Sequence, residues 1–355
     1  MKYPLFTLAS GLLALSLCLT KAAHAQAHYS VAVIGGAGAS VFGISRDGLK
    51  TTGQIGSNAF FTNNNATPIL SGLGRAFAIT DYGEHVGDAY FGSNSRAVYR
   101  VGTSVTDLGT LGGSSSMALS INTSFGTMVG VSDVPGNGAS HAFLRPLYSP
   151  MQDLGTLIGS SGWSWASFIT EENVVLGQSD VVVGGALFQH ACQWNGTTIQ
   201  DLEPSAPYTS IANAATHSYT TIYLNGITFS VRNTHSVGSY YPTSASRRAR
   251  IWTTNNYSSG ISAQNLQPLV SNAQYSEAIG INSARTVVGY SDIAFNGNPR
   301  ACRWQNGVVT NLNALMVGAP AGTVLLRAKS ISENGKIVVQ GMINGVGYSF
   351  LLTPQ

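Results

Sequence analysis

The stretch SSSMALSINTSFGTMVGVSDVPGNGASHAFLRPLYSPMQDLGTLIG, residues 114–159, decides the fold. It contains four short apolar clusters, MALSIN, TMVGVS, HAFLRP and MQDLGTL, which are separated by segments rich in Gly, Asn, Ser and Pro. Short apolar clusters between such turn-forming residues indicate short β-strands. The stretch therefore predicts a unit of four strands joined by tight turns.

The same order of clusters returns along the chain, which indicates a repeat protein. Residues 275–320 give EAIGIN, TVVGYS, RACRW and VTNLNAL, and residues 160–207 give ASFIT, NVVLGQS, HACQW and IQDLEP. Residues 321–355 contain three clusters and lack the fourth. The fainter copies occupy residues 39–74, 75–113 and 208–274. Residues 208–274 carry an insertion before FSVRN.

The incomplete last unit has its complement at the other end of the chain. Residues 26–38 contain HYSVAVIGGAG, which matches the fourth cluster VTDLGTLGG and precedes the first complete unit. A circular arrangement explains this offset, and closure removes the free sheet edges that would pair with other molecules. We therefore predict an all-β fold: a single closed β-propeller of about seven four-stranded blades, in which the N-terminal strand completes the last blade.

One glycine recurs inside the second strand of the repeat, at Gly87, Gly130, Gly177 and Gly289. Glycine weakens a strand interior, so its repetition there predicts a close approach of neighbouring backbones.

The first 25 residues have the features of a secretory signal. Lys2 is followed by an apolar run from Leu5 to Leu19 and by Ala23-His24-Ala25, which suits cleavage after Ala25. We expect a secreted bacterial protein, extracellular or periplasmic, whose propeller occupies residues 26–355. A membrane span needs about 20 apolar residues, and no later run approaches that length.

The composition restricts the partners. The chain has 18 Lys+Arg and 15 Asp+Glu, and removal of Lys2 and Lys21 with the signal leaves a net charge near zero. Nucleic-acid binding requires clustered cations, so no nucleic-acid partner is expected. Cys192 and Cys302 occupy one position in non-adjacent repeats, which favours two buried thiols over a disulfide. We expect a monomer.

The repeat resembles a known family. HAFLRP at residues 141–146, DLGTLGG at residues 107–113 and the intervening SINTSFGTMVGVS resemble the HAF repeat of bacterial extracellular proteins. The closing FLLTP at residues 350–354 is similar to the usual C-terminal segment of that family. The resemblance covers most of residues 29–354. It implies export and a repeat fold, and it implies no particular activity.

Two polar positions recur when the repeats are stacked. The third strand begins with a cationic or imidazole side chain in five repeats: Arg96, His141, His190, Arg248 and Arg300. The fourth strand carries an acid or amide in the same repeats: Asp107, Asp153, Asp201, Asn265 and Asn311. We interpret these residues as pairs within each blade that hold neighbouring strands in register. A ligand-binding ring of cations around the channel is the alternative.

A further acidic position follows the second strand. Its members are Asp88, Asp133, Asp180 and Asp292. An aspartate at such a place usually turns the chain by accepting a hydrogen bond from its own backbone two residues on. Oxygen-rich loops also suit Ca²⁺, although none of these loops has the spacing of a known calcium motif. We therefore expect no metal site, with these four residues as the candidates if one exists.

Aromatic side chains mark the candidate ligand-binding surface. We place the insertion on the face formed by the blade-linking loops and by the loops between second and third strands. The candidate residues are Tyr208, His217, Tyr219, Tyr223, Trp163 and Trp165. Aromatic rings beside neutral hydrogen-bonding groups suit sugars and protein surfaces. The alternative is that they pack as a local plug over the blade.

No catalytic or cofactor motif is present. The sequence contains no HExxH, CxxC, GxSxG or Walker loop, so no cofactor is expected. The first hypothesis is therefore a non-enzymatic binding or scaffold propeller for a surface protein or polysaccharide. The alternative is a carbohydrate-active hydrolase or lyase at the channel. It needs two acids, or a histidine with an acid, within reach of one bond.

Overall fold

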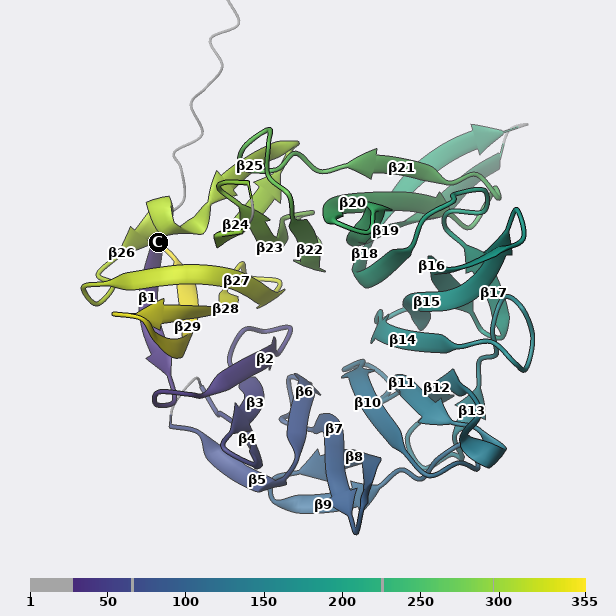
Figure 1. Cartoon of the computed structure of the whole chain (residues 1–355), viewed down its shortest axis with the longest axis horizontal. Coiled ribbons are helices and arrows are strands. Elements are labelled where there is room, and N and C mark those ends of the chain that lie inside the picture. Colours follow the sequence, from purple (N-terminus) through teal and green to yellow (C-terminus); the bar gives the residue numbers. More distant parts are fainter. Residues whose placement is uncertain (1–27, 65–66, 225–226, 296) are drawn as a thin grey trace, which may run out of the picture.

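The computed structural model describes residues 28–64, 67–224, 227–295 and 297–355, and the predicted signal segment, residues 1–25, lies outside these ranges. The described chain folds into seven β-sheets around a central axis, which confirms the predicted closed β-propeller (Figure 1). Within the described ranges the only helical elements are two short 3-10 helices, η1 (Pro135–Asn137) and η2 (Leu312–Leu315).

Blades 1 to 3 are antiparallel four-stranded sheets whose strands follow the chain from the axis to the rim. Blade 1 contains β2 (Ser40–Ile44), β3 (Thr51–Ile55), β4 (Asn58–Phe61) and β5 (Ile69–Leu73). Blade 2 contains β6 (Arg75–Ile79), β7 (His85–Phe91), β8 (Asn94–Val101) and β9 (Ser104–Asp107). Blade 3 contains β10 (Ser116–Ile121), β11 (Met128–Asp133), β12 (Ser140–Arg145) and β13 (Gln152–Asp153).

Blades 4 to 6 repeat this order. Blade 4 contains β14 (Ser164–Ile169), β15 (Val174–Val183), β16 (Ala186–Asn195) and β17 (Thr198–Asp201). Blade 5 contains β18 (Ser210–Leu224), β19 (Ile227–Thr243), β20 (Ser246–Asn255) and β21 (Ser262–Asn265). Blade 6 contains β22 (Ser276–Ile281), β23 (Val287–Asp292), β24 (Pro299–Gln305) and β25 (Val308–Asn311).

Blade 7 joins the two ends of the chain. Its strands are β27 (Thr323–Ile331), β28 (Ile337–Ile343), β29 (Val346–Pro354) and β1 (Tyr29–Ile34), so the N-terminal strand is the fourth strand of the last blade. A fifth strand, β26 (Met316–Val317), pairs in parallel with β1 at the rim. The predicted closure is therefore present, and β26 is an addition that the repeat pattern did not indicate.

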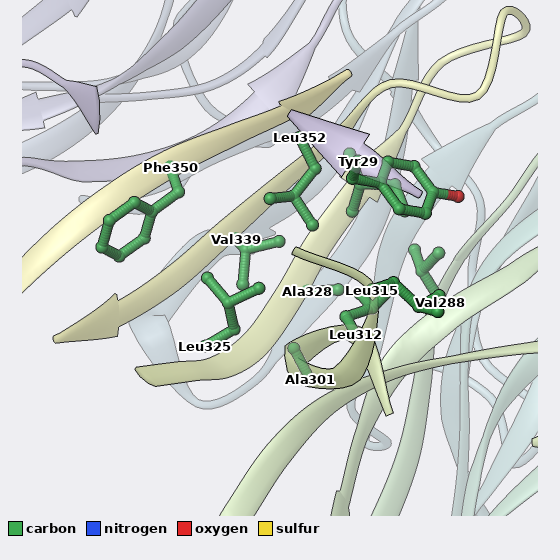
Figure 2. Packing of buried hydrophobic residues seen from close by; sticks show 11 residues of the cluster. Tyr29, Val288, Ala301, Leu312, Leu315, Leu325, Ala328, Val339, Phe350 and Leu352 are labelled. Carbon is green, nitrogen blue, oxygen red and sulfur yellow. The ribbon is translucent and has the colours of Figure 1, made fainter. Parts of the chain in front are cut away.

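Apolar layers between neighbouring blades form the core. Between blades 6 and 7, Leu312 and Leu315 of η2 pack with Val288, Leu325 and other buried residues, and Tyr29 of β1 belongs to the same cluster (Figure 2). Between blades 7 and 1, a second cluster includes Ile34. Both ends of β1 thus contribute buried side chains, which makes the closing strand part of the core.

The recurring glycines lie where two backbones meet. A Cβ on Gly130 would stand 1.9 Å from the carbonyl oxygen of Met117 in the first strand of the same blade. A Cβ on Gly87, Gly177 or Gly289 would stand 1.8–1.9 Å from the equivalent carbonyl oxygen. The first strand has a β-bulge beside this point, between Ala118 and Ser120 in blade 3. The bulge pushes the carbonyl toward the second strand, so only glycine fits.

Two faces of the disc are distinguished by their loops. On the linker face, the segment Gly112–Ser115 that links blades 2 and 3 bonds to the β11–β12 loop, with Ser114 N donating to Asn137 Oδ1 at 2.8 Å. The opposite face, called here the hairpin face, carries the turns between first and second strands. The predicted grouping of blade links with second-to-third loops is therefore present.

The insertion in blade 5 differs from the expectation. Residues Ser210–Leu224 form one continuous strand, β18, that pairs with β19 from Ser210↔Tyr240 to Leu224↔Ile227. The extra residues lengthen a hairpin, visible at the upper right of Figure 1, instead of forming a loop. They extend from the end of the strand that lies on the hairpin face, so the prediction that they lie on the linker face is wrong. The repeat pattern located the extra residues but could not show which end of the strand they lengthen.

Candidate functional site

The first strand of each blade lies nearest the central axis (Figure 1), and residues of these strands line a channel there. Side chains alternate along a strand, so one residue per blade points to the axis at each level. These side chains enclose a cavity of about 550 Å³, which is within the range of small-ligand sites. At its middle level the residues are Phe42, Phe77, Leu119, Ser167, Asn213, Ile279 and Lys329.

The channel is apolar on one side and polar on the other. Blades 1 to 3 contribute Phe42, Phe77 and Leu119, and the two phenylalanine rings lie with centroids 5.3 Å apart. Blades 4, 5 and 7 contribute Ser167, Asn213 and Lys329, and Ile279 of blade 6 is the one apolar residue on this side at this level. An apolar wall opposite hydrogen-bonding groups suits a ligand that presents both kinds of surface.

Two of the four glutamates that line the cavity tie neighbouring blades together. Glu171 of blade 4 accepts hydrogen bonds from the backbone N–H groups of Thr123 (3.0 Å) and Ser124 (2.8 Å) in blade 3. Glu333 of blade 7 accepts from the Ser283 N–H at 3.0 Å and lies 3.7 Å from Arg46. Each carboxylate satisfies a turn of the adjacent blade, so its role is structural.

The other two glutamates are also paired. Glu172 lies 3.1 Å from His217 Nε2, and the Nδ1 atom of His217 is 3.1 Å from Thr234 Oγ1. Glu277 accepts from Asn213 at 3.0 Å and from Arg247 at 2.5 Å. Burial lowers the pKa of His217 although Glu172 opposes the shift. Each cavity glutamate therefore has a partner, and this pairing does not favour acid–base chemistry by two free carboxyls.

A second cavity of about 560 Å³ opens on the linker face between blades 5, 6 and 7. It shares Glu277, Ile279 and Lys329 with the channel cavity, so the two spaces adjoin. Its remaining lining includes Arg247, Tyr290 and Arg327. Burial raises the pKa of Tyr290 to about 12, which keeps this phenol protonated at neutral pH.

The predicted aromatic site residues do not form one cluster. On the linker side, Tyr208 donates a hydrogen bond to Glu203 at 3.0 Å and stacks near Tyr240, with ring centroids 5.1 Å apart. Trp163 and Trp165 flank the start of β14, and only Trp165 lines the channel. Tyr208 is thus a packing residue, whereas Trp165 belongs to the candidate site.

The other predicted aromatic residues belong to the blade 5 hairpin. His217 is buried between Glu172 and Thr234 near the channel end. Tyr219 lines the cavity and is 62% exposed, and Tyr223 lies further out and is 74% exposed. Both tyrosines are on one face of the hairpin because they are four residues apart on a strand.

Three of the expected polar pairs are present within their blades. His141 lies 2.8 Å from Asp153, His190 lies 2.9 Å from Asp201, and Arg96 lies 3.7 Å from Asp107. Burial would lower the pKa of His190, but its hydrogen bond to Asp201 raises the pKa above the usual value. These contacts join third and fourth strands, as a structural role requires.

The two expected pairs with asparagine are wrong. Asn265 accepts from Arg250, two residues beyond the predicted Arg248, and Arg248 bonds to backbone carbonyls instead. Asn311 accepts from the N–H of Asn313 at 3.0 Å, whereas Arg300 donates to the carbonyl of Pro299. A neutral amide oxygen attracts a guanidinium less than a carboxylate does, so Arg248 and Arg300 bond to nearby backbone carbonyls instead of reaching the predicted asparagine.

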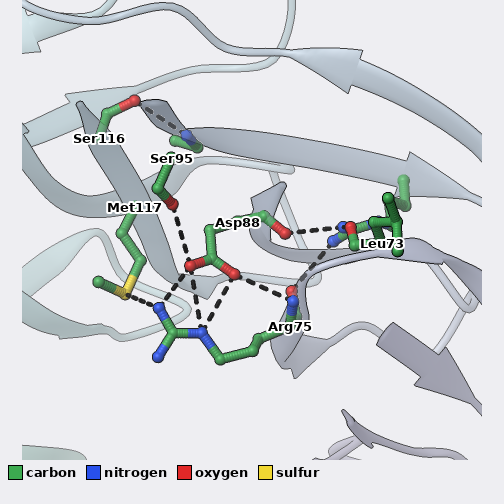
Figure 3. Close-up of polar contacts among 8 residues, drawn as sticks. Leu73, Arg75, Asp88, Ser95, Ser116 and Met117 are labelled. Carbon is green, nitrogen blue, oxygen red and sulfur yellow. Dashed lines mark hydrogen bonds and ion pairs between the residues drawn. The ribbon is translucent and has the colours of Figure 1, made fainter. Parts of the chain in front are cut away.

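The second acidic position also has a different role from the one expected. Asp88 accepts from the N–H of Arg75, at the start of the first strand of its own blade, and its carboxylate pairs with the Arg75 guanidinium at 2.5 Å (Figure 3). Asp133, Asp180 and Asp292 likewise accept from Ser115, Trp163 and Tyr275. These aspartates fasten the inner strand and do not turn their own loop. In the described part of the chain, no three His, Cys, Asp or Glu residues gather as metal ligands would.

One contact between neighbouring blades was not predicted from the sequence. Ser116 accepts from the N–H of Ala97 in the preceding blade, and Ser164, Ser210 and Ser276 make the same contact. The motif Ser-x-Ala at the start of the first strand could have identified this contact between blades. The two buried thiols predicted in place of a disulfide are confirmed: Cys192 and Cys302 are free and buried, and burial raises the pKa of both thiols.

The comparisons with known proteins give no relative. No family model matches the chain, and no curated protein is similar enough to it to be a match. Among the described residues, no helix has the length and apolarity needed to cross a membrane. The channel geometry therefore carries the functional interpretation.

Proposed function

We propose that this chain is a secreted bacterial propeller, related to the HAF repeat proteins, that binds a surface protein or a polysaccharide without catalysis. The observation that carries the proposal is the two-sided channel, with Phe42 and Phe77 opposite Ser167 and Asn213 and next to Lys329. Such a lining offers an apolar wall and hydrogen-bonding groups to one ligand. The four cavity glutamates are engaged by protein partners, which supports binding over hydrolysis.

Exposed aromatic residues give the ligand two further places to make contact. Trp165 is 38% exposed at the linker end of the channel, and Tyr219 and Tyr223 project from the hairpin at the other end. Exposed aromatic side chains supply large contact areas at low entropic cost. A chain that entered the channel would meet aromatic surface at both mouths.

Binding to a glycan array and to extracts of surface proteins tests this proposal. Trp165→Ala should weaken binding at least tenfold, because Trp165 lines the channel. Trp163→Ala is the matched control, since Trp163 is 50% exposed two residues away but is not among the channel-lining residues. Equal losses in both variants, or no ligand in either screen, would contradict the proposal. Release of reducing sugar from a bound glycan would favour a hydrolase.

Export is tested separately. The native gene product should appear outside the cytoplasm with Gln26 as its first residue, because Ala23-His24-Ala25 suits signal peptidase. N-terminal sequencing of the exported protein measures this directly, and an intact Met1 would contradict it.

A further inference from the structure

Blade 7 places Lys329 on the channel wall and Arg327 in the adjoining cavity of the linker face. Arg327 and Lys329 are two residues apart on β27, so their side chains lie on the same face of the strand. Both line the cavity on the linker face, and Lys329 also lines the channel cavity. Two positive charges therefore face the same enclosed space.

Neither cation makes a direct ion pair within the described residues, although Glu277 and Asp292 lie near enough to interact electrostatically with Lys329 and Arg327, respectively. Within residues 28–64, 67–224, 227–295 and 297–355, no ion pair or hydrogen bond involves the Lys329 ammonium group, and none involves the Arg327 guanidinium. Arg327 lies over the ring of Tyr290, with its Cζ atom 4.9 Å from the ring centroid. Lys329 is half-buried, and this burial lowers its pKa although Glu277 opposes the shift. An anion placed here would give both cations the direct partner that they lack.

The nearby carboxylates are already engaged. Glu277 has one oxygen 2.5 Å from Arg247 and the other 3.0 Å from the amide of Asn213. Asp292 is 2% exposed and accepts from the Tyr275 N–H at 3.1 Å. The cations of β27 thus remain available to a ligand although two acids line the same cavity.

The neighbouring wall indicates what the anion is attached to. Phe42 and Phe77 present apolar surface on blades 1 and 2, of which blade 1 lies directly beside blade 7, and Ser167 and Asn213 present neutral polar groups on the far side of the channel. A sugar ring has an apolar face and a rim of hydroxyl groups, and it matches both surfaces. An acidic peptide would use the cations but would leave the polar groups and the apolar wall without a fitted partner.

We propose that the channel binds an acidic saccharide, with the carboxylate of a uronic acid on Lys329 and Arg327 and the sugar ring against Phe42 and Phe77. This proposal deepens the proposed binding function and rests on it. The proposed saccharide site does not include the blade 5 hairpin. The two cations are few enough to agree with the near-neutral charge of the whole chain, which argues against a highly charged phosphate polymer.

Calorimetry with a short oligogalacturonate tests the ligand class. The acid form should bind, and the fully methyl-esterified oligosaccharide, which has the same rings without charge, should bind at least tenfold more weakly. Equal binding of the two forms would overturn the role of the cations while leaving the binding function intact. Binding of a polyglutamate peptide or of inorganic phosphate as tight as that of the oligosaccharide would overturn the assignment to a sugar.

Variants of opposite sign test the site. Lys329→Gln should weaken oligogalacturonate binding at least tenfold, whereas Glu277→Gln should strengthen it severalfold, because Arg247 loses its counter-charge. Arg285→Asn is the control. Arg285 is an exposed cation in the turn between β22 and β23 of blade 6, on the hairpin face. Its φ of 56° is one that asparagine tolerates. This variant should leave the affinity unchanged. An unaltered affinity in Lys329→Gln, or equal weakening in all three folded variants, would overturn the proposal.

Discussion

Tyr29 lies opposite Pro354 in an antiparallel ladder that joins the first described strand to the last. The ladder continues through five more pairs to Ile34 opposite Ser349. Tyr29 also accepts a hydrogen bond from Arg303 of blade 6 on its hydroxyl, at 3.1 Å. The closure of the ring therefore depends on one short strand with contacts to two blades.

Deletion of residues 28–36 should lower the melting temperature by about 10 °C or more, because the edge of β29 and the cluster around Tyr29 lose their cover. A synthetic peptide of residues 28–38 added in excess should restore most of the loss. A scrambled peptide is the control. Equal stability of the deleted and intact proteins, measured by thermal unfolding, would contradict the role of β1 in closure.

Gly130→Ala should destabilise the protein by at least about 2 kcal/mol, since the new Cβ would meet the Met117 carbonyl at 1.9 Å. Gly347→Ala is a matched control within a strand, because a Cβ there meets nothing within 4 Å. It should change the free energy of unfolding little. Denaturant unfolding of both variants measures the difference in the free energy of unfolding. Similar free energies for the two variants would show that the bulged strand can move to make room for a Cβ at Gly130.

Acid should destabilise the fold through His85. Burial lowers the pKa of His85 from 6.5 to about 4, so the unfolded chain binds a proton that the folded chain does not between these values. Stability should therefore fall by about 3 kcal/mol as the pH falls from 6.5 toward 4. In His85→Val, which copies Val287 of blade 6, the slope of stability against pH should be smaller. An unchanged slope would assign the acid sensitivity to other groups.

His190 should act with the opposite sign. Burial alone would lower its pKa, but Asp201 raises it above 6.5, so its contribution is present below pH 6.5 and is lost as the pH rises through the folded value. Asp201→Asn should cost about 1–2 kcal/mol at pH 5 and less at pH 9. Asp107→Asn, whose partner Arg96 stays charged, should show no such pH dependence. Chemical unfolding at both pH values distinguishes the two pairs.

The architecture could be predicted because the same pattern of four strands recurs in each repeat. The glycine of the second strand and the apolar clusters return in most units, so errors in one unit are corrected by the others. The missing cluster after Pro354 and the strand at Tyr29 then indicated closure. Local geometry was less accessible: Arg250 and Arg248 stand on the same side of one strand, and only the packing decides which of them reaches Asn265.

The candidate site could not be predicted for a physical reason. Residues that recur in every blade, such as Asp133 and Ser116, make contacts that every blade needs. The middle level of the channel instead holds seven residues of mixed chemistry, from Phe42 to Lys329, because each faces a different part of the same space. Alignment of the repeats emphasises the recurring residues, whereas the channel chemistry lies in the varying ones.

The pairing of β1 with β29 also orders events during synthesis. β1 is synthesised before every other strand of the propeller, so it has no antiparallel partner until β29 has been made. The ring can therefore close only after β29 is present, and a product that stopped before β29 would expose an open sheet edge.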